Sequence, residues 1–200
     1  MRIALFGGTF DPPHCGHRAI ATAAADAFHL DRILFAPTGL QPLKTTLPPA
    51  PYQDRLAMVA LAIQQDPRFS TSTLDAPHLT GLPNYTVDTL TTLRQLYPDD
   101  TLFNLVGADS FLALPKWRDS GRLLDLADWI VVSRPGSPLP EPLPFPLKPQ
   151  QITRVHRLET VHLDISSTDL RHRLHQGDPC SDILPPGVPD YIRQHHLYQT

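Results

Sequence analysis

The sequence has few cysteines, no long apolar run and no excess of basic residues, and each lack excludes a class of protein. Its two cysteines, Cys15 and Cys180, are too few for a disulfide framework and lack the paired spacing of a zinc site, so we expect reduced thiols. No apolar run approaches membrane-spanning length, and residues 2–6 are too short a run for a secretory leader. A formal net charge of -3 argues against a nucleic-acid partner. We therefore expect a cytoplasmic protein with one domain spanning residues 1–200.

Proline, in contrast, is abundant. Many of the 23 prolines fall in residues 135–149, PGSPLPEPLPFPLKP, which can form neither a helix interior nor a central strand. Such a segment could be a polyproline II ligand for a partner, but an extended surface loop is the more common case. We expect a surface loop without a functional role.

Apolar runs alternate along the chain with segments that favour helix. We expect strands at 2–6, 33–36, 69–74, 101–106, 127–133 and 154–163, and helices at 18–30, 86–97, 167–176 and 188–197. A further helix follows Pro51, with Leu56, Val59, Ala60 and Ile63 as its core-facing stripe. Continuous apolar strands separated by helices predict an α/β fold, a doubly wound, Rossmann-like parallel sheet with helices on both faces.

Ligands of such sheets bind outside the carboxyl ends of the strands. The segments that follow the predicted strands hold most of the sharply placed polar residues: 7–17, 37–44, 107–117, 134–136 and 165–171. We expect these segments to converge in space.

The first of these loops, GGTFDPPHCGH at 7–17, lacks both the dinucleotide-binding and the P-loop signatures. Gly8 lets a ligand approach the backbone, Thr9 offers a hydroxyl and an amide, and the following helix start favours anions. His14 and His17 are three residues apart, a spacing that can direct both imidazoles at one phosphate. A metal pair would need a third ligand at matching spacing, and a purely structural role would leave the density of special residues unexplained. We therefore favour a phosphate site.

This loop resembles the G-G-T-F-D-P-x-H-x-G-H signature of the HxGH nucleotidylyltransferases. Residues 165–171, ISSTDLR, resemble the second motif of that family, I-S-S-T-x-x-R. Read from the residues alone, Ser166 or Ser167 caps a helix, leaves the next amides free for phosphate oxygens and places Arg171 one turn further on, although an ordinary capped helix would look the same. The resemblance implies that this segment holds the phosphates of ATP.

Other segments resemble those of the nicotinate-nucleotide adenylyltransferases, and the similarity spans nearly the whole chain. They are YTVDTL at 85–90, GADS at 107–110, LPKW at 114–117, SRPG at 133–136 and the ending from 184 to 198. The resemblance implies that Trp117 stacks on the nicotinate ring, that amides near Thr86 and Trp117 bind its carboxylate, and that Asp109 binds the ATP ribose. Trp117 could equally be a core residue and Asp109 a helix cap.

The resemblance thus assigns three groups of residues. The catalytic group is His14, His17, Lys44 and Arg171. The ATP-binding group is Gly8, Thr9, His14, His17, Gly107, Asp109, Ser166, Ser167, Thr168 and Arg171. The group that binds the acceptor is Phe10, Lys44, Tyr85, Thr86, Trp117 and Arg134.

One departure from the family pattern lies after Pro37, where the usual P-P-H-K or P-P-H-R segment is replaced by Gln41-Pro42-Leu43-Lys44. The histidine is therefore Leu43, and only the charge of Lys44 remains. We expect Lys44 to contact phosphate, and substrate affinity or loop closure to differ from the family pattern.

The predicted reaction is adenylyl transfer from ATP to nicotinate mononucleotide, giving deamido-NAD and pyrophosphate in NAD biosynthesis. We expect Mg²⁺ to be held mainly by the substrate phosphates, with no protein metal site. The expected partners are these two small molecules, without nucleic acid or membrane, and a homo-oligomer is compatible with them. Two alternatives stay open: a related adenylyltransferase acting on nicotinamide mononucleotide or phosphopantetheine, and a non-catalytic nucleotide-binding regulatory protein.

Overall fold

The computed structural model describes residues 1–43, 47–133, 138–159 and 165–199, and its centre is a parallel sheet of six strands. The strands are β1 (Arg2–Gly8), β2 (Arg32–Pro37), β3 (Phe69–Thr71), β4 (Thr101–Gly107), β5 (Asp128–Ser133) and β6 (Val155–Glu159). They lie in the order β3-β2-β1-β4-β5-β6, and all neighbours are parallel. This is the strand order of doubly wound sheets, so the predicted fold class is confirmed.

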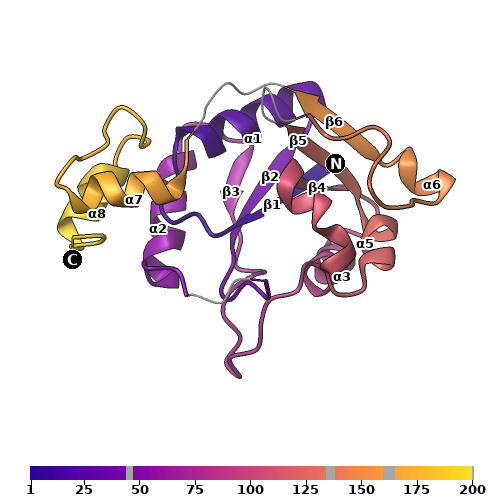
Figure 1. The fold of residues 1–200 in the computed structure, drawn as a ribbon, viewed down its shortest axis with the longest axis horizontal. Coiled ribbons are helices and arrows are strands. Elements are labelled where there is room, and N and C mark those ends of the chain that lie inside the picture. Colours follow the sequence, from indigo (N-terminus) through magenta and orange to yellow (C-terminus); the bar gives the residue numbers. More distant parts are fainter. Residues whose placement is uncertain (44–46, 134–137, 160–164, 200) are drawn as a thin grey trace.

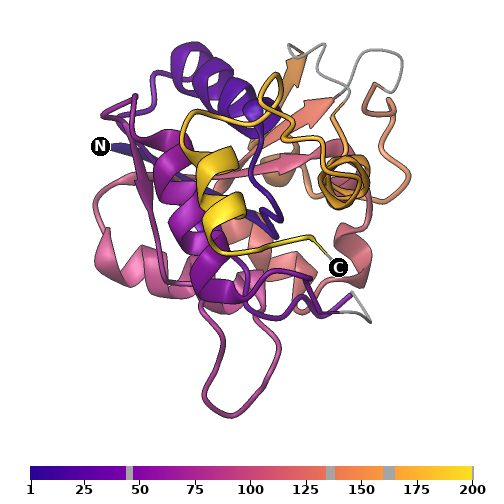
Figure 2. The same ribbon diagram turned by 90° about the vertical axis from the view of Figure 1, so that its left-hand side faces the viewer.

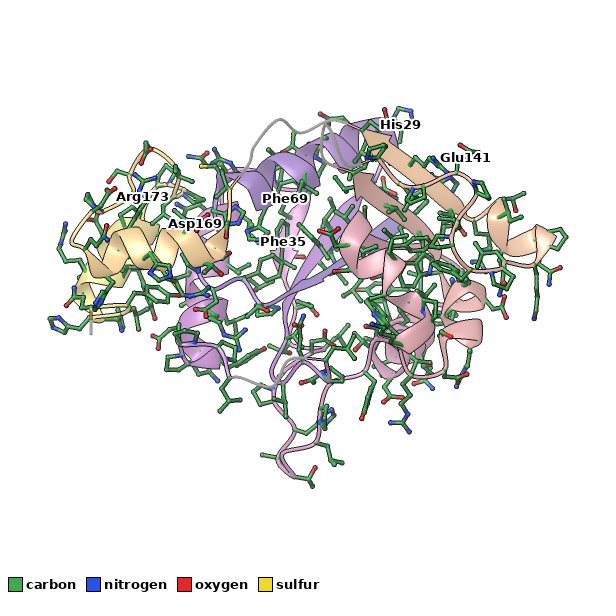
Figure 3. The ribbon with its side chains drawn as sticks, in the orientation of Figure 1. His29, Phe35, Phe69, Glu141, Asp169 and Arg173 are labelled. Atoms are coloured by element: carbon green, nitrogen blue, oxygen red, sulfur yellow. The ribbon has the colours of Figure 1, made fainter. Side chains whose placement is uncertain are left out.

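Helices cover both faces of the sheet (Figure 1). One face packs against α1 (Cys15–Ala27), α2 (Tyr52–Ile63), α7 (Ser167–His175) and α8 (Val188–Gln194), and the other against α3 (Thr86–Leu96), α4 (Ala108–Leu112) and α5 (Ser120–Leu126). Successive strand residues alternate between the faces, so Phe6 joins the first apolar cluster while Leu5 joins the second. Phe35 and Phe69 belong to the first cluster and lie within the fold in Figure 3. The four central strands, β2, β1, β4 and β5, are therefore buried on both sides, as their apolar runs predicted, whereas the outer strands β3 and β6 are partly exposed.

Most predicted elements are present with shifted ends. Helix α1 begins at residue 15 and ends at residue 27, against the predicted 18–30, and β6 ends at Glu159 within the predicted 154–163. Residues 160–164 lie outside the described residues. Three short helices and a 3-10 turn were not predicted: α4, α5, α6 (Pro149–Ile152) and Leu114–Lys116. Segments of three to seven residues are too short to show a helical period.

The predicted core-facing stripe of α2 is confirmed at Val59 and Ile63 and wrong at Ala60. The buried side chains of this helix include Arg55, Met58, Val59 and Ile63, whereas Ala60 is exposed. The predicted stripe was drawn through apolar residues alone, so it did not include Arg55. Arg55 instead lies on the core side, where it has a specific partner described below.

The switch point of the sheet lies between the paired strands β1 and β4, because the chain leaves β1 toward one face of the sheet and leaves β4 toward the other. The described part of the proline-rich segment is remote from α7: Glu141 and the α7 residues Asp169 and Arg173 lie at opposite ends of the molecule in Figure 3. Within the described ranges, no helix combines the length and apolarity needed to cross a bilayer.

Candidate active site

The loop between β1 and α1 is shaped by Phe10, whose backbone has a φ of +50°. This left-handed conformation is unfavourable for a bulky residue and occurs where the surroundings enforce it. The Phe10 side chain is 2% exposed and meets the rings of Phe6 and His17 edge to face, with centroids 5.5 and 4.9 Å away. Phe10 was predicted to bind the acceptor, but its side chain lies in the core beneath His17. A contact with substrate through its backbone stays a prediction.

The two histidines of the loop lie against each other. Their rings stack with centroids 3.7 Å apart and an interplanar angle of 27°. The backbone N-H of His14, the residue that caps α1, donates to Nδ1 of His17 at 3.2 Å. A side chain at the third helical position that accepts from the capping residue is half of a capping box, here with histidine in place of glutamate. The three-residue spacing therefore fixes both rings at the helix start.

Gly16, between the histidines, is required by the close approach of the His14 ring. A Cβ at this position would lie 2.9 Å from His14 Nδ1, closer than real Cβ contacts allow. Any side chain at residue 16 would therefore displace the His14 ring, which explains a glycine at this point of the motif.

The protonation state of His17 follows from this geometry. Because Nδ1 accepts a hydrogen bond from a backbone N-H, the hydrogen of the neutral ring is assigned to Nε2. Burial of the ring, together with the neighbouring imidazole of His14, lowers the pKa of His17 well below its ordinary value of 6.5. At neutral pH the ring is thus neutral and offers one N-H donor to a ligand.

The second motif lies beside the first loop, although 160 residues separate the two in sequence. Ser166 caps α7, and its side chain accepts from the backbone N-H of Asp169 at 3.5 Å. Arg171 donates from Nη1 to the carbonyl oxygen of Asp11 at 2.8 Å and from Nη2 to Thr168 Oγ1 at 3.2 Å. Ser167 Oγ is 3.5 Å from the carbonyl oxygen of Pro12. The expected convergence of these two segments is confirmed.

Sequence reasoning missed the buried charges that support the loop. Arg55 is 1% exposed; its Nη1 donates to the carbonyl oxygen of Thr9 at 2.7 Å and its Nε to that of Ala50 at 3.2 Å. Asp11 is 2% exposed and accepts from the backbone N-H of Ala50 at 3.3 Å. One pattern in the sequence could have indicated that Arg55 is buried. Arg55 has the i, i+3, i+4, i+7 spacing of a helix face with Met58, Val59 and Ala62.

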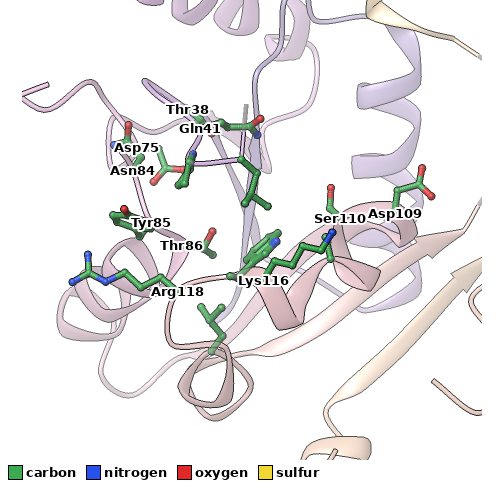
Figure 4. Close-up of a pocket in the computed structure, with 15 residues that line it drawn as sticks. Thr38, Gln41, Asp75, Asn84, Tyr85, Thr86, Asp109, Ser110, Lys116 and Arg118 are labelled. Carbon is green, nitrogen blue, oxygen red and sulfur yellow. The ribbon is translucent and has the colours of Figure 1, made fainter. Parts of the chain in front are cut away.

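A cavity of about 570 Å³ has the usual size of small-molecule sites. It lies next to the histidine loop at Thr38, a lining residue whose backbone N-H donates to the carbonyl oxygen of Gly8 at 2.9 Å. Four predicted site residues line it: Tyr85, Thr86, Asp109 and Trp117. Other lining residues were not predicted: Thr38, Gln41, Asp75, Asn84, Ser110, Lys116 and Arg118, among others (Figure 4). Trp117 is partly buried, with its ring centroid 5.9 Å from that of Trp129, so it both packs on the core and faces the cavity.

The cavity wall formed by Asp75 and Asn84 is held by hydrogen bonds between loops. Asn84 Oδ1 accepts from the backbone N-H of Leu40 at 2.9 Å, while its Nδ2 donates to the carbonyl oxygen of Ala76 at 2.8 Å. Asp75 is buried and accepts from the hydroxyl of Thr89. Burial raises the pKa of the Asp75 carboxyl, although its hydrogen bonds act in the opposite direction.

Five further residues bear on the predicted site. Lys44 and Arg134 lie outside the described residues. Leu43, the departure from the family pattern, is 58% exposed and lines the cavity. Gly107 caps α4 at the end of β4, and the exposed Asp109 follows two residues later, so Asp109 is not the cap. In the part of the chain that the structure describes, no three His, Cys, Asp or Glu side chains are grouped as metal ligands would be.

Comparison with known proteins relates this arrangement to one family. Residues 5–173 match the model of the cytidylyltransferase-like family. The chain is 41% identical over 201 residues to the protein of Thermus thermophilus named "Probable nicotinate-nucleotide adenylyltransferase", with all of both chains covered. It is 44% identical to that of Roseiflexus sp., with 98% of each chain covered. The structure of the Plasmodium falciparum nicotinic acid mononucleotide adenylyltransferase complexed with NaAD has a TM-score of 0.76 and 19% identity, covering 98% of this chain and 97% of the other.

Proposed function

Because this chain belongs to the nicotinate-nucleotide adenylyltransferases, within the cytidylyltransferase-like family, we propose that it transfers the adenylyl group of ATP to nicotinate mononucleotide. The products are deamido-NAD and pyrophosphate, and the reaction is a step of NAD biosynthesis. We place this reaction in the cytoplasm.

The observation that carries this proposal is the hydrogen bond from Arg171 to the carbonyl oxygen of Asp11. This bond holds the start of α7 and the guanidinium of Arg171 beside the loop of the histidine pair, at the carboxyl ends of the strands. N-H groups at helix starts and the fixed donors of arginine are suited to phosphate oxygens. Ser166, Ser167 and Thr168 then bind the β- and γ-phosphates with Arg171, and Gly8 and Thr9 offer backbone donors on the other side.

The reaction needs positioning more than proton transfer. An oxygen of the acceptor's phosphate, ionised at neutral pH, attacks the α-phosphorus of ATP in line; the new P-O bond forms as the bond to the bridging oxygen of pyrophosphate breaks. Neutral His17 donates from Nε2 to a non-bridging oxygen of the α-phosphate, assisted by His14 and by the charges of Lys44 and Arg171. Mg²⁺, when bound, would be held mainly by the ATP phosphates and would neutralise part of their charge.

The acceptor occupies the cavity beside the loop. Trp117 offers a flat face for the pyridinium ring, for which stacking and cation-π attraction act together. Tyr85, Thr86 and Arg134 complete the acceptor site, with backbone amides near Thr86 and Trp117 binding the nicotinate carboxylate. Asp109 and Gly107, at the end of β4, receive the ribose of ATP.

A pyrophosphate-release assay tests the proposal. With ATP, nicotinate mononucleotide should be turned over faster than nicotinamide mononucleotide or phosphopantetheine. Trp117→Ala should raise KM for the mononucleotide about tenfold and leave KM for ATP within about twofold, because only the ring loses its stacking partner. Trp117→Phe, which keeps a flat ring, should lie in between. Release with none of the acceptors would instead favour a nucleotide-binding regulatory protein, and equal effects on both KM values would make Trp117 a core residue only.

A further inference from the structure

The segment that follows α7 runs back along α2. Helix α8 lies beside α2 in Figure 2, and Tyr191 of α8 donates from its hydroxyl to Asp54 Oδ1 of α2 at 2.9 Å. The ring of His195 stacks on Tyr191 with centroids 4.0 Å apart, and its Nδ1 is 3.6 Å from the same carboxylate. We refer to residues 188–199 as the tail. These contacts anchor the tail on α2.

Beyond this anchor, the tail reaches the loop that carries the histidine pair. The hydroxyl of Tyr198 donates to Asp11 Oδ1 at 2.5 Å, across 187 positions in sequence. The Tyr198 ring packs against the first apolar cluster, and its backbone has a φ of +62°. Burial and the negative charge of Asp11 raise the pKa of the Tyr198 hydroxyl. The hydroxyl therefore keeps its hydrogen and acts as a donor to a buried carboxylate.

Asp11 connects this contact to the proposed catalytic groups. Its side chain accepts from Tyr198 and Ala50, and its carbonyl oxygen accepts from Arg171. Without the Tyr198 hydroxyl, the buried carboxylate of Asp11 would lose one of its hydrogen-bond donors. If the loop shifted so that Asp11 could find another donor, Arg171 would shift too, because it is bonded to the carbonyl oxygen of Asp11.

We propose that Tyr198 is a positioning residue for adenylyl transfer, holding through Asp11 both the loop of the histidine pair and the guanidinium of Arg171. The inference rests on the proposed function, since it assigns these groups to ATP. Loss of the Tyr198 hydroxyl should therefore weaken the binding and turnover of ATP. It should not affect binding of the acceptor in the cavity, because neither Tyr198 nor Asp11 lines that cavity.

The test compares two substitutions that each remove one tail hydroxyl bonded to an aspartate. Tyr198→Phe keeps the ring and should lower kcat and raise KM for ATP, with kcat/KM for ATP reduced about tenfold, the effect of losing one hydrogen bond to a charged group. KM for nicotinate mononucleotide should stay within about twofold. Tyr191→Phe, the matched control, should leave all three constants near those of the wild type, while both variants lower the thermal midpoint similarly. In an Asp11→Asn background, Tyr198→Phe should have a much smaller further effect.

Equal kinetic constants for Tyr198→Phe and Tyr191→Phe would overturn the proposal, as would equal effects of Tyr198→Phe on both substrates. Calorimetric titration with ATP separates this inference from the proposed function. If the wild type binds ATP but releases no pyrophosphate with any acceptor, the proposed function fails. Weaker ATP binding by Tyr198→Phe alone would then still support the positioning role, and unchanged binding would end it.

Discussion

The imidazole of His17 has its two nitrogens assigned to different tasks. Nδ1 accepts the backbone N-H of His14 and completes the start of α1, which leaves Nε2 as a donor toward the proposed phosphate site. The stacked ring of His14 and the edge of Phe10 hold the plane of the ring. The His17 side chain thus completes the cap of α1 through Nδ1 and offers one hydrogen bond from Nε2. The direction of that bond is set by the bond between Nδ1 and the backbone N-H of His14.

Replacement of this ring tests the catalytic task. His17→Ala should lower kcat by about 10² to 10³, the usual effect of losing one preorganised donor to a developing charge. The lost cap should cost only about 1 kcal/mol of unfolding free energy, so the variant should remain folded. Steady-state kinetics and thermal unfolding measure the two effects. His175→Ala, an exposed histidine at the end of α7, is the control that should change neither. Near-normal turnover by a folded His17→Ala protein would remove His17 from this role.

At the scale of elements, α2 illustrates how a charged residue can belong to the buried side of a helix. Arg55 follows the same i, i+3, i+4, i+7 spacing as Met58, Val59 and Ala62. Its buried guanidinium donates to the carbonyl oxygen of Thr9, just after β1, and to that of Ala50, just before α2. The helix thereby connects the core to the loop that contains Thr9.

Loss of the Arg55 guanidinium should destabilise the protein. Arg55→Met keeps an unbranched apolar stem but leaves the carbonyl oxygens of Thr9 and Ala50 without this donor and Asp11 without a nearby cation, which should lower the free energy of unfolding by about 2 to 4 kcal/mol. Urea denaturation measures the change. A change at the exposed position 60 of the same helix, Ala60→Gln, should stay within about 0.5 kcal/mol. A difference of less than 0.5 kcal/mol between the two variants would show that Arg55 contributes little.

The sequence allowed the central strands to be predicted because each of them is a largely apolar run. It allowed the two halves of the proposed site to be recognised because both are local motifs. It did not reveal Arg55, Asp75 or Tyr198, since the reason for their positions lies in partners far along the chain. The short helices after β4 were missed because a helix of five to seven residues depends on packing more than on its own periodicity. Short sequence motifs therefore identified the residues proposed to act on the substrates. The residues that hold these motifs in place could be found only from the structure, because their partners are distant in sequence.

At the scale of the whole molecule, the proposed site lies at the switch point of the sheet, between segments that leave toward opposite faces. The histidine loop and α7 belong to one face, and the cavity with Trp117 belongs to the other. The two substrates can therefore bind on opposite sides of the switch point and meet there. The carboxyl ends of the strands between them fix the relative position of the two binding sites.

The pH dependence of global stability should report on His17. Because its folded-state pKa is below 6.5, the unfolded state binds more protons below about pH 6.5, and the free energy of unfolding falls as the pH decreases. The slope from this one group is at most about 1.4 kcal/mol per pH unit. His17→Gln keeps an acceptor for the His14 N-H but does not titrate, so it should lose less stability than the wild type between pH 7 and 5.5.

Urea denaturation at several pH values gives the comparison. Asp75, whose pKa is raised, acts in the opposite direction but equally in both proteins, so its effect cancels in the difference. Parallel stability curves for the wild type and His17→Gln would contradict a lowered pKa of His17.

The contacts of Asp11 also set an order of events during synthesis. The loop that contains it leaves the ribosome before its partners Arg171 and Tyr198, which follow 160 and 187 residues later. At 5 to 20 residues per second, the interval to Tyr198 is roughly 10 to 40 seconds. Throughout that interval the nascent chain has a first loop whose aspartate has no tyrosine to bind. The proposed ATP site therefore gains its Tyr198 contact only after the whole stretch from Asp11 to Tyr198 has been made.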